Sequence, residues 1–210
     1  MNVLSANDLV RMIDNMRRLL VENREKLIQL DSEMGDGDLG IYMASGMESA
    51  FKAVQELPEK KLPCDVFNAV ARTFFREAPS TMGTLLSTAF MQAAKDMSDK
   101  EELDAQGLVA VYGSFVVGIE RRGGAKLGDK TILDVLIPAS TKATETMKAG
   151  GALSDIALSA YMQAKEGLET AKGLKAVYGR PAYFGDKTIG KYDGGTVVGM
   201  LLCQAIYETA

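Results

Sequence analysis

GTVVGMLLCQAIY, residues 195–207, carries valine, leucine, isoleucine and methionine on nearly every side of the helix that it predicts. A helix with one apolar stripe lies at the surface of a protein, whereas a helix that is apolar all round is buried among other elements. We therefore expect residues 195–207 to form a central helix that other helices surround.

The rest of the chain predicts those neighbours. Apolar residues recur at helical spacing between glycine- or proline-rich breaks, and no alternating strand pattern with hairpin turns stands out. Seven further helices are predicted: about residues 9–30 with a cap at Asn7 or Asp8, then about 40–56, 63–77, 80–95, 103–121 and 130–148, and one that Ser154 caps. Short connections favour antiparallel neighbours. The expected fold is all-α, a single domain over residues 1–210 built as an eight-helix antiparallel barrel or bundle.

Composition excludes several classes of function. The chain has no histidine, which excludes Ser-His-Asp or Cys-His catalysis, imidazole metal ligands and a role as a phosphohistidine carrier. With only two cysteines, a bound metal should be a hard cation held by oxygen. The net charge of −4 argues against nucleic acid and anionic membrane as partners, and no apolar run approaches a membrane span. We expect a cytoplasmic protein.

LDSEMGDGDLG, residues 30–40, is the strongest chemical signal. It sets Asp31, Asp36 and Asp38 between two predicted helices, and three carboxylates this close repel one another unless they share a cation. The N-terminus of the next helix favours phosphate, so a magnesium ion with positions open to phosphate oxygens fits the pattern. A calcium EF-hand loop does not fit, because its sixth-position glycine and twelfth-position glutamate are missing. The alternative is an acidic turn whose aspartates cap the following helix.

Two further loops are rich in glycine and polar residues. The pentapeptide GDKTI occurs at 128–132 and again at 185–189, but neither copy has the spacing of a phosphate-binding Walker loop. YGRPAYFGDKTIGKYDGGT, residues 178–196, places an arginine and an aspartate before a Gly-Gly pair whose amides can meet phosphate at the start of the last helix. Taken alone, the first loop is better interpreted as a helix cap and the second as a structured connector.

Together, the three loops resemble one family. LDxxxGDGDxG at 30–40, RRGGAKLGDKTILD at 121–134 and GRxxYxGxxxIGxxDxG at 179–195 are similar, in the same order, to motifs of the nucleotide-binding L subunit of dihydroxyacetone kinases. The resemblance implies a barrel of eight antiparallel helices that binds ADP or ATP at one end, with two magnesium ions on Asp31, Asp36 and Asp38. It also implies nucleotide contacts from a larger set of residues: Leu39, Gly40, Ile41, Tyr42, Ala78, Ser80, Gly118, Thr131, Ile132, Arg180, Asp193, Gly194 and Gly195.

The chain departs from the family pattern at three places. Where the family has a phosphate loop rich in glycine and serine, this chain has FREAP at 75–79, and Glu77 brings negative charge towards a polyphosphate unless it turns away. Ser80, Thr81 or the amides before the next helix can substitute for that loop. Leu39 and Tyr42 stand where the family usually has histidine and asparagine. Gly194 replaces the proline that usually follows the aspartate of the lid, which loosens the expected lid.

The resemblance implies a phosphotransferase subunit. It would transfer a phosphoryl group from the magnesium nucleotide to dihydroxyacetone, or a related small ketose, held on a partner K-type subunit. In one version ATP is consumed; in the other, which we favour slightly, ADP stays bound and a phosphohistidine carrier protein rephosphorylates it. No catalytic base is assigned in this chain. The alternative is a degenerate L-type subunit that acts as a non-catalytic metal- or partner-binding regulator, and the sequence leaves open whether the chain forms a homodimer.

Overall fold

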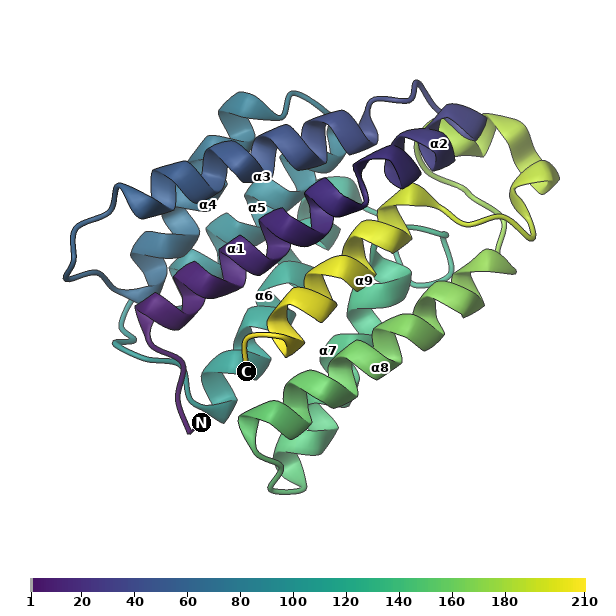
Figure 1. Ribbon diagram of the computed structural model, residues 1–210. Helices are drawn as coiled ribbons and strands as arrows, with labels where there is room; N and C mark the ends of the chain where they lie inside the picture. The colour runs from purple at the N-terminus through teal and green to yellow at the C-terminus, as the bar shows by residue number, and fades with distance from the viewer. Residues whose placement is uncertain (1) are drawn as a thin grey trace.

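The computed structural model describes residues 2–210 as helices joined by short loops (Figure 1). The α-helices are α1 (Ala6–Glu22), α2 (Arg24–Met34), α3 (Leu39–Gln55), α4 (Pro63–Glu77), α5 (Thr81–Asp96), α6 (Ala105–Gly123), α7 (Leu133–Lys148), α8 (Leu153–Lys172) and α9 (Gly194–Tyr207), and a 3-10 helix, η1 (Arg180–Thr188), precedes α9. Within residues 2–210 no strand forms, and only an isolated antiparallel bridge joins Leu4 to Leu103. The prediction of an all-α fold is confirmed.

Eight of the helices form a closed ring. Each packs against the next in the order α1, α3, α4, α5, α6, α7, α8 and α9, and α9 packs back on α1. Neighbours run in opposite directions, as Figure 1 shows for α9 between α1 and α8. The predicted antiparallel barrel is therefore present, although the described chain has ten helices where eight were predicted, because α2 and η1 are additional.

The two additional helices have local causes. The helix predicted over residues 9–30 breaks at Asn23, whose side-chain Nδ2 donates to the carbonyl oxygen of Leu19 at 2.8 Å and so takes an acceptor at the end of α1. Within the segment predicted as a loop from 173 to 195, residues Arg180–Thr188 form η1. Both additions lie at the same end of the barrel (Figure 1).

Two helices have N-caps other than those predicted. Ser5 caps α1, in place of Asn7 or Asp8, because its Oγ accepts from the amide of Asp8, whose carboxylate accepts in turn from the amide of Ser5. α8 begins after Ala152 and not after Ser154, because the carboxylate of Asp155, in its first turn, accepts from the Ala152 amide at 3.0 Å.

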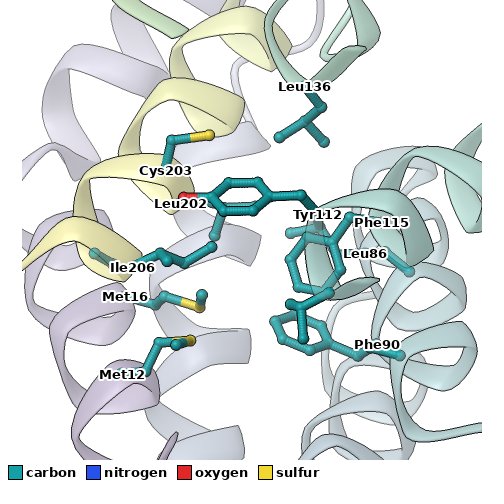
Figure 2. Close-up of a cluster of buried hydrophobic side chains, with 14 of the residues drawn as sticks. Met12, Met16, Leu86, Phe90, Tyr112, Phe115, Leu136, Leu202, Cys203 and Ile206 are labelled. Carbon is teal, nitrogen blue, oxygen red and sulfur yellow. The ribbon is translucent and has the colours of Figure 1, made fainter. Parts of the chain in front are cut away.

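The barrel interior is filled by apolar side chains. α9 is buried on nearly every side, as predicted, because it packs on α1, α7 and α8. Figure 2 shows Leu202 and Ile206 of α9 facing an aromatic cluster in which the rings of Phe90 and Phe115 meet edge to face at 4.9 Å. The buried Tyr112 hydroxyl points towards Leu202 and Cys203 of α9 (Figure 2) and has no hydrogen-bond partner within residues 2–210. Among these residues no helix is both long and apolar enough to cross a membrane.

Candidate functional site

A cavity of about 900 Å³ opens at the end of the barrel where α3, α5 and α9 begin. Figure 1 shows this end at the upper right, where α2 and the segment before α9 also lie. The wall combines residues from the acidic loop, the start of α5, the turn before α7 and the segment before α9. Three loops that are far apart in sequence, and that carry the three predicted motifs, therefore share one cavity.

The acidic loop brings three carboxylates together. Asp31 lies in the last turn of α2 and not in a loop, Asp36 lies in the connection, and Asp38 is the N-cap residue of α3. Each offers one oxygen to a cluster whose atoms all lie within 4.8 Å of one another. Gly35 makes this possible, since a Cβ there would lie 2.2 Å from Oδ1 of Asp31. The backbone after it turns through Gly37, whose φ of +76° favours glycine.

Hydrogen bonds and charge hold the cluster in place. Oδ2 of Asp31 accepts from the amides of Asp38 and Leu39, at 3.0 and 3.3 Å, so the start of α3 fixes its orientation. Burial, and then the neighbouring carboxylates, raise the pKa of Asp38. Nη2 of Arg180 lies 2.6 Å from Oδ2 of Asp36 and supplies positive charge from across the cavity. A cluster that offers only oxygens and draws a cation towards it fits a hard divalent ion such as magnesium.

The start of α5 forms the second part of the wall. Ser80 is its N-cap, and the Ser80 Oγ accepts from the amide of Gly83 at 3.0 Å. The amides of Thr81 and Met82, in the first turn, have no partner within residues 2–210, and both residues line the cavity. Glu77 does not line it, because its carboxylate turns aside to pair with Nε of Arg76 at 2.6 Å. The departure at 75–79 therefore leaves amides at the cavity without adding negative charge.

The start of α9 forms the third part. Asp193 is the N-cap residue, and its carboxylate accepts from the amide of Thr196 at 2.8 Å. Burial raises the pKa of Asp193 to about 6, against the opposing effects of that hydrogen bond and of the charge of Lys130. Gly194 and Gly195 pack closely here, since a Cβ on Gly194 would lie 2.4 Å from the Leu39 side chain. The helix start therefore closes directly over the start of α3.

Most of the predicted site residues lie in the cavity wall. These are Asp31, Asp36, Asp38, Leu39, Ser80, Thr131, Ile132, Arg180, Asp193, Gly194 and Gly195. Five others do not line it: Gly40, Ile41, Tyr42, Ala78 and Gly118.

Packing explains the positions of these five. A Cβ on Gly40 would lie 2.2 Å from a backbone carbonyl of α2, and a Cβ on Gly118 would lie 2.8 Å from one of α5, so both glycines allow helices to approach closely. Ala78 is buried at the end of α4, and Tyr42 packs on the core. Ile41 is exposed on the surface of α3. These five positions therefore lie outside the cavity wall, whereas the other eleven predicted positions line it.

Other wall residues were missed by the sequence analysis. Arg122, Lys130 and Tyr178 line the cavity, and the Tyr178 hydroxyl donates to the carbonyl of Gly124 at 3.0 Å, which joins the two loops. Arg122 belongs to the motif RRGGAKLGDKTILD at 121–134, but the motif alone did not identify it as a residue of the site. The two GDKTI copies prove to be in contact, because Nζ of Lys130 in the first donates to the carbonyl of Thr188 in the second at 2.7 Å.

Comparison with known proteins places the chain among relatives of similar length. It is 34% identical over 200 residues to the ADP-binding subunit DhaL of PEP-dependent dihydroxyacetone kinase 1 of Listeria innocua, covering 95% of this chain and 94% of that one. It is 29% identical to the ADP-binding subunit DhaL of the PTS-dependent dihydroxyacetone kinase of Lactococcus lactis, covering 98% of each chain.

Solved structures share the fold. The native crystal structure of the dihydroxyacetone kinase of C. freundii matches all of this chain with a TM-score of 0.73 at 22% sequence identity. The chain spans only 36% of that kinase. The model of the DAK2 domain matches residues 33–208, from the acidic loop to the end of α9. With that match and a relative above 30% identity, the chain belongs to the DAK2 domain family.

Proposed function

We propose that the chain is the nucleotide-binding subunit of a ketose phosphotransferase. It would bind ADP or ATP with magnesium in the cavity and transfer a phosphoryl group to dihydroxyacetone, or a related small ketose, held on a partner K-type subunit. The observation that carries this proposal is the cluster of Asp31, Asp36 and Asp38 in one cavity with the unpaired first-turn amides of α5. A cation site beside amides at a helix start suits a polyphosphate.

The residues of the chain have distinct roles in this proposal. The three aspartates would hold magnesium, proposed as two ions, and the bound metal would neutralise charge that develops during transfer. The amides of Thr81 and Met82 would donate hydrogen bonds to phosphate oxygens at the start of α5. Arg180 would move its guanidinium from Asp36 to a phosphate, since both are anionic partners for its planar donors.

The names of relatives support the ADP version. The two DhaL subunits cited above are called ADP-binding, and their kinases PEP-dependent or PTS-dependent. A second C. freundii kinase structure, at 22% identity, is a complex with Mg²⁺ and AMP-PNP, an ATP analogue, so it does not distinguish the two versions. We therefore favour ADP as a bound carrier that a phosphohistidine protein recharges while the K-type subunit presents the ketose. Direct use of ATP is the other version.

A non-catalytic regulator is the alternative function. Its specific support is the FREAP stretch at 75–79, which replaces the glycine-rich phosphate loop of the family. Such a protein would keep the metal cluster and lose nucleotide affinity, so binding measurements separate the two functions.

Calorimetric titration with ADP and ATP, with and without magnesium, tests the proposal. Asp36→Ala should weaken magnesium-nucleotide binding at least about tenfold, the lower end of the loss seen even for residues that only support a metal ligand. Asp99→Ala, which removes an exposed carboxylate beyond the far end of α5, is the matched control and should bind as the wild type does. Nucleotide binding that is absent at millimolar concentration, or equal without magnesium, would exclude the phosphotransferase function for the isolated chain.

A further inference from the structure

Lys130 is a buried cation that the proposed chemistry does not use. Its residue is 2% exposed, although lysine is almost always at the surface. Its backbone has φ of +58°, the only positive value among the non-glycine residues 2–210. Both features carry an energetic cost, since burial of an ammonium and a left-handed backbone are each unfavourable. Burial lowers the pKa of Lys130, and the charges of Asp193 and Asp134 oppose that effect.

The ammonium of Lys130 reaches both ends of the segment 173–193, which we call the lid segment. At the start it donates to the carbonyl oxygens of Lys172 and Leu174, each at 3.1 Å. At the end it donates to those of Thr188 and Lys191, each at 2.7 Å. One side chain from the turn before α7 therefore joins the end of α8 to the approach to α9.

These contacts leave the ammonium no proton for a phosphate. A lysine carries three N–H donors, and four carbonyl oxygens already lie within 3.1 Å of Nζ. Lys130 lines the cavity, but its donors point into the base of the lid segment. Any effect of the residue on a bound nucleotide must therefore pass through that segment.

The lid segment carries the groups that face the acidic cluster. Arg180 reaches Asp36 from within it, and Asp193 ends it at the start of α9. Its outer part is exposed, with Tyr183 at 91% exposure. Other bonds also tie the segment to the barrel: the Val177 amide donates to the carbonyl of Asp129 at 3.3 Å, the Tyr178 hydroxyl to that of Gly124 at 3.0 Å, and the Tyr192 hydroxyl to Glu169 at 2.7 Å, and Lys191 pairs with Glu33 at 3.0 Å. Two other bonds close its base: the amide of Gly190 donates to the Lys172 carbonyl at 2.8 Å, and that of Ala176 to the Thr188 Oγ1 at 3.0 Å.

We propose that Lys130 is a positioning residue for nucleotide retention, whose ammonium closes the base of the lid segment and so holds Arg180 over the cavity. The retention part rests on the proposed function, whereas the closure of the lid segment does not. Lys130 combines a left-handed backbone with four carbonyl partners in the lid segment and at the end of α8. These contacts hold the lid segment closed, which the stability of α7 alone would not require.

The test compares Lys130→Met, which keeps the length of the side chain and removes its charge, with Lys130→Arg and with Lys126→Met, an exposed lysine of the same turn. Hydrogen exchange of the full chain without ligand should rise at least about tenfold at amides 174–192 in Lys130→Met, with little change in α1, α3 and α6. Lys130→Arg should restore part of the protection, and Lys126→Met should behave as the wild type. If Lys130→Met does not fold, Lys130→Gln, which still donates two hydrogen bonds, replaces it.

The second measurement is the release rate of a fluorescent ADP analogue with magnesium. Lys130→Met should release it at least about tenfold faster at an unchanged number of sites, because the lid segment no longer covers the nucleotide. Unchanged exchange at 174–192, or a uniform rise across all helices, would overturn the proposal. If the wild type binds no ADP, the proposed function fails while the exchange experiment still decides the role of Lys130 in the lid segment.

Discussion

Replacement of Asp193 by asparagine should remove one source of pH dependence from the stability of the protein. Asp193 caps α9, and an asparagine side chain can accept the same hydrogen bond from the amide of Thr196. Burial raises the pKa of the Asp193 carboxyl from 3.8 to about 6. The substitution keeps the cap and removes the titrating group.

The sign follows from proton binding. Between pH 3.8 and about 6 the folded state holds the Asp193 proton more often than the unfolded state does, so the free energy of unfolding falls as the pH rises. The full difference corresponds to about 3 kcal/mol, present below pH 4 and lost above pH 6. About 2 kcal/mol of it should disappear between pH 4.5 and pH 8.

Urea unfolding of the wild type and of Asp193→Asn at a series of pH values measures this effect. The changed cap alters the free energy of unfolding by an amount that does not depend on pH. Only the change with pH of the stability difference between the two proteins is therefore compared. We expect Asp193→Asn to gain about 2 kcal/mol relative to the wild type between pH 4.5 and pH 8. If the stability of Asp193→Asn relative to the wild type stays constant over this range, or falls as the pH rises, burial does not raise the pKa of Asp193 to about 6.

Three further predictions concern packing and reactivity. Gly40→Ala should lower the free energy of unfolding by about 3 kcal/mol, because its Cβ would meet a backbone carbonyl of α2. Gly113→Ala, whose Cβ meets nothing within 4 Å in the middle of α6, should raise it by about 1 kcal/mol; thermal unfolding of both variants checks the contrast. Tyr112→Phe should stabilise the protein by about 1 kcal/mol in the same assay, since its buried hydroxyl lacks a partner among residues 2–210, and a loss of stability would contradict this by pointing to a bond with buried water. A thiol reagent should modify Cys64 in the native protein and Cys203 only after unfolding, because Cys203 is fully buried and burial raises its pKa to about 12; equal rates would contradict this.

Much of the fold could be predicted because apolar periodicity and helix breakers are local signals. The all-round apolar pattern of residues 195–207 identified the buried α9, and Pro63 marked the first residue of α4. The break at Asn23 gave no such signal, since Leu20 and Leu27 keep helical phase across it. A side-chain amide that ends one helix and allows another to start does not interrupt the hydrophobic pattern.

The site was predictable where short sequence spacing fixes geometry, and less so elsewhere. Asp31, Asp36 and Asp38 lie close together because the short loop that joins them, with glycines at 35 and 37, limits how far apart they can be. Lys130 could not be distinguished from a surface lysine, because its four partners are backbone carbonyls, which carry no sequence signature. The family resemblance placed Gly118 near the nucleotide; in the structure it does not line the cavity, and it allows α5 and α6 to approach closely.

A crystal structure of the chain with Mn²⁺ and ADP would show whether metal and nucleotide share the cavity, because anomalous scattering locates the manganese. Manganese replaces magnesium in oxygen sites and gives a signal that phosphate and water do not. We expect anomalous peaks at about 2.2 Å from carboxylate oxygens of Asp31, Asp36 and Asp38, with the phosphates of ADP bound between the metal and the start of α5. Manganese at another place, or ADP outside the cavity, would contradict this expectation.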